Sequence, residues 1–76
     1  MNKKDRKELD RAIEYIGSAM EIIEKIKDQE QEKFDNLSEG LQQTERGQKF
    51  EEKVSTLEEV IQNLEEATGN IEISSE

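Results

Sequence analysis

Mostly apolar residues in the second half of the chain recur at alternating intervals of four and three positions. The series is Phe50, Val54, Leu57, Ile61, Leu64, Thr68 and Ile71, with Val60 and Ala67 beside it. Such spacing places a side chain on the same face of an α-helix at every turn, and over about three heptads it is typical of a coiled-coil seam. No proline interrupts any part of the chain. The pattern predicts a long amphipathic helix that buries one stripe against another helix.

The first half of the chain carries a similar seven-residue repeat. With Leu9, Ile16 and Ile23 at heptad position a, the d positions hold Ala12, Ala19 and Ile26, the e positions Ile13 and Met20, and the g positions Tyr15 and Ile22. The resulting apolar arc spans about 160° at 100° per residue. We expect a helix over about residues 3–35 that starts at Asn2 or Asp5, both good N-cap residues.

Turn-forming residues separate the two repeats. We expect a turn over about residues 36–44, with one short helical turn capped by Ser38, and a second helix over about residues 45–68 that begins after Thr44. Gly69 and Asn70 are typical of a helix C-cap, so residues 70–76 are predicted to form a frayed tail. Two helices joined by so short a connection must run antiparallel.

These elements predict one all-α domain over residues 1–76, an antiparallel two-helix hairpin that resembles a coiled coil. A hairpin buries a single seam, and the first helix has a wider apolar arc than one partner helix can cover. We therefore expect a homo-oligomer, a dimer of hairpins that forms a four-helix bundle, with a partner protein as the alternative source of the missing helices. The predicted oligomer core contains Leu9, Ile13, Ile16, Met20, Ile23, Phe50, Val54, Leu57, Ile61 and Leu64.

The chain lacks the side chains that metal sites and catalytic sites most often use. The chain has no Cys and no His, which removes thiolate metal sites, the commonest metal ligand and the commonest general base. The acids that could bind a divalent cation lie outside the apolar register, and they are Glu14, Glu21, Glu24, Asp28, Glu30 and Glu32. We expect no enzyme activity, no metal and no cofactor. The absence of Cys fits a reducing, cytoplasmic location.

A net charge of −9 disfavours nucleic acids and anionic membranes as partners and favours other proteins. The N-terminal cluster Lys3, Lys4, Arg6, Lys7 and Arg11 has no interleaved aromatic residues, so direct nucleic-acid binding is not expected. No stretch has the length and apolarity of a membrane span.

Two surfaces are candidates for partner binding. The first, the acidic ladder, consists of pairs at seven-residue intervals: Glu51, Glu52, Glu58, Glu59, Glu65 and Glu66. It could imitate a phosphate backbone, although charged residues are the rule on the solvated outer face of a coiled coil. The second is the turn, where Leu37, Leu41, Gln42, Gln43 and Arg46 exceed what a connection requires. An arginine beside an apolar patch can form a protein-binding hot spot; the alternative is that the leucines simply close the end of the bundle.

The stretch from Asp28 to Leu37, followed by Glu39 to Gln48, resembles short acidic helical proteins encoded by bacteriophages and prophages. These carry a proline where this chain has Ser38, which implies a less rigid turn here. The resemblance implies a phage origin and no mechanism. We expect an accessory protein that binds, and inhibits or modulates, a host bacterial protein. The alternatives are a self-associating assembly subunit and an acidic DNA mimic that blocks a DNA-binding protein.

Overall fold

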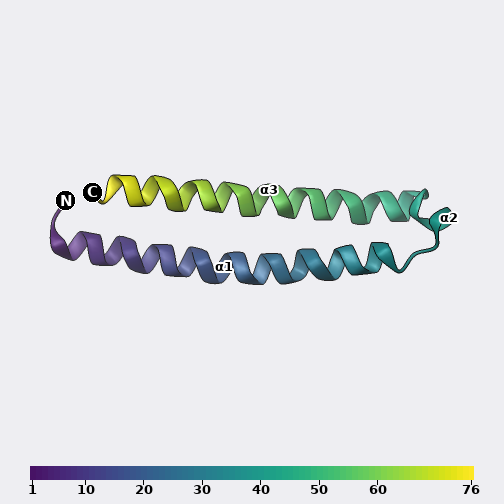
Figure 1. Ribbon diagram of the computed structural model, residues 1–76, viewed down its shortest axis with the longest axis horizontal. Helices are drawn as coiled ribbons and strands as arrows, with labels where there is room; N and C mark the ends of the chain where they lie inside the picture. The colour runs from purple at the N-terminus through teal and green to yellow at the C-terminus, as the bar shows by residue number, and fades with distance from the viewer.

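The protein is built from two long helices and a short one. The computed structural model describes residues 1–76, with helix α1 at Lys3–Asp35, α2 at Glu39–Gln42 and α3 at Glu45–Ser74, and it contains no strand. Helices α1 and α3 lie side by side in opposite directions, α2 lies in the turn, and both termini lie at the other end (Figure 1). The molecule is a rod with extents of 58 × 15 × 11 Å.

Side-chain caps define where the helices begin. The Asn2 side chain accepts a hydrogen bond from the Asp5 N–H at 2.7 Å, which selects Asn2 over Asp5 as the N-cap of α1. Ser38 caps α2 in the same way, because its hydroxyl accepts from the Leu41 N–H at 3.4 Å. Thr44 precedes α3, but its hydroxyl donates back to the Leu41 carbonyl and makes no capping bond.

The end predicted for the second helix at Gly69 and Asn70 is wrong. Helix α3 continues to Ser74, and Gly69 keeps a helical backbone in place of the left-handed conformation of a C-cap. Ile71 extends the seam and is half-buried, and the Ser74 hydroxyl donates to the Asn70 carbonyl at 2.9 Å. Burial of Ile71 outweighs the cost of about 1 kcal/mol for glycine in a helix interior, so the predicted frayed tail is largely helical.

Gly69→Ala should therefore stabilise the protein. A Cβ at this position would meet nothing within 4 Å, and the backbone is already helical. We expect a gain of about 0.5–1 kcal/mol in the free energy of unfolding, measured by urea denaturation at fixed protein concentration. A loss of stability would show that Gly69 serves a contact outside the single chain.

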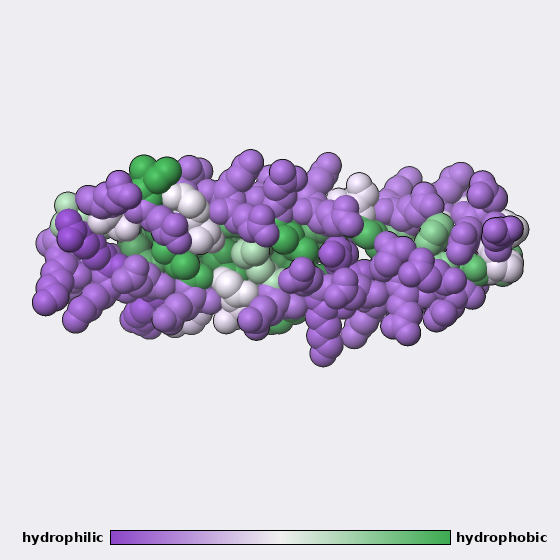
Figure 2. Space-filling view, in the orientation of Figure 1, coloured by the Kyte–Doolittle hydropathy of each residue, from purple (hydrophilic) through white to green (hydrophobic).

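The seam between α1 and α3 is shallow. Val54, at 8% exposed, is the only buried apolar side chain. The other nine residues of the predicted core are half-buried along the same seam, so the ten side chains pack within the hairpin. Figure 2 shows apolar surface gathered along the line between the two helices, with hydrophilic surface over their outer sides.

Helix α1 faces α3 with its a and e positions in the half of the rod that is nearer the turn. There the seam contains Lys27 and Glu30, whose side chains are 22% and 15% exposed. Ile26, at position d, remains 44% exposed. The covered stripe is therefore rotated away from the predicted one, and apolar surface is left outside the hairpin.

Candidate protein-binding surfaces

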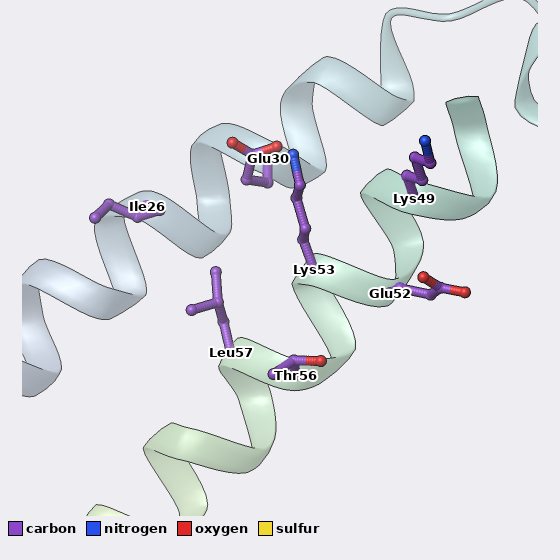
Figure 3. A pocket seen from close by; sticks show the side chains of 7 residues that line it. All are labelled: Ile26, Glu30, Lys49, Glu52, Lys53, Thr56 and Leu57. Carbon is purple, nitrogen blue, oxygen red and sulfur yellow. The ribbon is translucent and has the colours of Figure 1, made fainter. Parts of the chain in front are cut away.

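An open groove runs between the two long helices near the turn. Its volume is about 570 Å³, and it is lined by Ile26 and Glu30 of α1 and by Lys49, Glu52, Lys53, Thr56 and Leu57 of α3 (Figure 3). Ile26 and Leu57 supply its two apolar side chains, and four of the other five residues carry charge. The groove is a gap in the seam, at the place where polar side chains replace the apolar series of α1.

Glu30 is the least satisfied group in this groove. One of its carboxylate oxygens, Oε1, accepts from the Lys33 ammonium at 3.2 Å, whereas Oε2 is buried without a hydrogen-bond partner. Lys53 points from α3 toward α1 (Figure 3), and its Nζ lies 5.5 Å from the centre of the Phe50 ring. A buried carboxylate oxygen without a hydrogen-bond partner costs free energy, so Glu30 is an unfavourable residue at this seam position.

An uncovered apolar face lies on the same side of the hairpin as the groove. We define the uncovered face by Tyr15, Ile22, Ile26 and Val60, which are 66%, 61%, 44% and 36% exposed. The three residues of α1 fall within about 40° of one another on the helix, and Ile26 also lines the groove. Val60 follows the groove residue Thr56 by one helical turn on α3.

Some of the polar and apolar residues of the turn stabilise the turn itself. The Gln42 side-chain amide donates to the carbonyls of Phe34 and Leu37, at 3.2 and 3.1 Å, and thereby ties α2 to the end of α1. Leu37 is half-buried. Leu41 remains 50% exposed at the tip.

Gln43 and Arg46 complete the exposed part of the turn, and Arg46 forms no ion pair. The turn candidate is thereby reduced to three side chains: one leucine, one glutamine and one arginine. Such a small patch can serve as a contact point within a larger interface.

The acidic ladder is solvated. All six glutamates are exposed, and none of them forms an ion pair within the chain. Their heptad spacing places successive pairs about 10 Å apart along α3, away from the seam. Glu51, Glu58 and Glu65 fall on the side of α3 opposite the uncovered face, whereas Glu52 lines the groove beside it.

The remaining acids of α1 form no recognisable site. Glu21, Glu24, Asp28 and Glu32 border a shallow depression together with Lys25 and Gln29, and no apolar side chain contributes to it. No group of three or more carboxylates is arranged to hold a metal ion.

Sequence reasoning missed the uncovered face as a distinct surface. It included Tyr15, Ile22 and Ile26 in a single stripe together with the residues that α3 covers. The stripe's width indicated that part of it must stay uncovered, because one helix covers only part of a 160° arc (about 100°), but the width does not say which edge. Glu30 falls at position a of the same register and lies in the seam, so its placement outside the apolar register was wrong. With Lys27 at position e it also indicated that the stripe rotates near the turn.

Comparison with known proteins gives no family: no protein-family model, curated protein or solved structure matches this chain. Neither long helix contains a segment that is apolar and long enough to cross a membrane.

Proposed function

We propose that this chain is a non-enzymatic accessory protein that works by binding other proteins, as a dimer of hairpins. The observation that carries the proposal is the uncovered face, because four large apolar side chains on one side of the rod remain 36–66% exposed. Contiguous exposed apolar surface of this kind is typical of interaction sites. Two hairpins that bury these faces against each other form a four-helix bundle.

The dimer leaves the turn and the acidic ladder free for a second protein. We place the contact with that protein at the turn, where Leu41 is 50% exposed and the exposed Arg46 forms no ion pair. The resemblance to short phage-encoded proteins supports a host bacterial protein as the target, with inhibition or modulation as the effect. The lack of cysteine supports a cytoplasmic setting.

A second candidate function uses the acidic ladder as a DNA mimic. It is favoured by six exposed glutamates at regular spacing on one face of α3. A third reading, an assembly subunit, requires only self-association. The two binding surfaces are separable by mutation because the turn lies at one end of the rod and the ladder along its side.

Capture from a bacterial lysate with paired variants tests these alternatives. We expect Leu41→Ala with Arg46→Ala to abolish capture of a host protein that the wild type retains at stoichiometric amounts. Replacing the six ladder glutamates by Gln should leave capture intact. Binding through the turn should depend only modestly on salt, because the turn contributes a single arginine, whereas the exposed charges of the ladder would be screened within about 8 Å at physiological ionic strength.

The reverse pattern supports the DNA mimic: loss of capture in the Gln variant, with steep weakening of wild-type binding by salt and normal binding by the turn variant. Circular dichroism of both variants provides the folding control. If the wild type captures no protein, the assembly subunit becomes the better reading.

A further inference from the structure

The first observation is that this chain exposes more surface than a compact protein of its size. Its accessible surface is 5875 Å² at a mass of 8.8 kDa. A compact monomer of that mass exposes about 4,800 Å² by the usual scaling of surface with mass. The excess is about 1,100 Å², and a stable interface buries about 800 Å² per partner. One further chain on one face is enough to bring the surface into the normal range.

The second observation is that charge differs between the two sides of the rod. By helical position Glu51, Glu58 and Glu65 of the ladder fall on the side of α3 away from the uncovered face, whereas the groove side is mixed, with Glu30 and Glu52 beside Lys49 and Lys53. Two chains with a net charge of −9 repel each other. Contact through the uncovered face is the arrangement that keeps the two ladders apart.

The third observation is a spacing on α1 that reads the same in both directions. The side of α1 that carries the uncovered face presents Tyr15, Ala19, Ile22 and Ile26, at intervals of four, three and four. A two-fold axis midway between residues 20 and 21 sets Tyr15 opposite Ile26 of the second copy and Ala19 opposite Ile22. Tyr15 then packs against Ile26 and the small Ala19 against Ile22, and each contact occurs twice, as a two-fold interface requires. The same axis sets Glu8 opposite Lys33 of the second copy.

Resting on the dimer in the proposed function, we infer that a second copy of this chain covers the uncovered face, with the two turns at opposite ends of the bundle. The opposite choice, with both turns at one end, stacks each α1 on the other copy's α3. That choice brings Lys33 near both Lys49 and Glu52 of the second copy, so charge gives it no advantage, and it leaves the symmetric spacing of α1 unused. The pairing of Tyr15 with Ile26 and of Ala19 with Ile22 therefore selects the arrangement with the turns at opposite ends.

Cysteine pairing tests this face directly, since the chain has no cysteine of its own. We expect a mixture of Tyr15→Cys and Ile26→Cys chains to form a disulfide-linked heterodimer under mild oxidation. Each variant alone should remain uncrosslinked, because identical positions lie about 16 Å apart along the paired helices. Glu58→Cys, on the acidic ladder, is the matched control and should not crosslink in any mixture.

A nitroxide at Gln43→Cys tests the orientation without altering the face. Turns at opposite ends place the two labels apart by a large part of the 58 Å length of the rod. Labels within about 25 Å of each other, roughly the width of a bundle of such helices, would overturn the orientation.

A charge exchange provides the last test. Glu8→Lys should weaken the dimer by roughly tenfold in dissociation constant, because two ion pairs become repulsive, and adding Lys33→Glu should restore it. A wild-type dimer in sedimentation, combined with no crosslink between the Tyr15→Cys and Ile26→Cys chains, would overturn this face and leave the proposed dimer standing. If the wild-type protein stayed monomeric at all concentrations, the proposed dimer itself would be wrong.

Discussion

Val54→Asp is expected to unfold the hairpin. Val54 is the only buried apolar side chain, and it belongs to the heptad series that α3 presents to α1. The substitution places an unpaired carboxylate in the seam and removes apolar burial from a core that has little of it. We expect a loss of about 3–4 kcal/mol, a large fraction of the total for a chain of this size. Far-ultraviolet circular dichroism during thermal unfolding measures it.

Two control variants separate charge from size at this position. Val54→Ala removes methyl groups without adding charge and should cost about 1–2 kcal/mol. Glu58→Gln, four residues further on the exposed side of α3, should change stability by less than about 0.5 kcal/mol. If Val54→Asp and Glu58→Gln behaved alike, the heptad register of α3 would be incorrect.

Gly47→Ala should destabilise the turn end of the rod. Gly47 is buried, and a Cβ there would collide with the carbonyl oxygen of Gln42 and lie 2.7 Å from its carbonyl carbon. These are backbone atoms, so relief requires α2 to move away from α3. Such a shift strains the two hydrogen bonds from the Gln42 side chain to the end of α1. We expect a cost of about 2–3 kcal/mol in urea denaturation at fixed protein concentration.

Gly40→Ala is the matched control, because it is the same substitution in the same turn region. A Cβ at Gly40 would meet nothing within 4 Å, and the residue lies in α2 with a helical backbone. It should be neutral or slightly stabilising. Equal destabilisation by both variants would mean that flexibility in the turn, and not the close approach of Gly47, is what the fold requires.

The candidate surfaces differ in how far the sequence predicted them. Heptad spacing alone placed the ladder glutamates outside the seam, because side chains at those heptad positions point away from the partner helix. The turn was predicted as a cluster of five side chains, but Gln42 forms two hydrogen bonds to the end of α1 and Leu37 is half-buried. A side-chain amide that satisfies backbone carbonyls in a turn cannot be distinguished in sequence from one that faces solvent.

The sequence by itself determined the all-helical class, the two long helices, the short capped turn at Ser38 and the seam positions of α3. These follow from local physics: heptad spacing, the lack of proline and the capping chemistry of short polar side chains. Tertiary structure alone decided three further points. It carried α3 past Gly69, since burial of Ile71 outweighs glycine's local preference. It gave Gly47 its contact with Gln42. It also rotated α1 so that Lys27 and Glu30 face α3 while Ile26 does not, because a stripe wider than its partner can be covered along either edge.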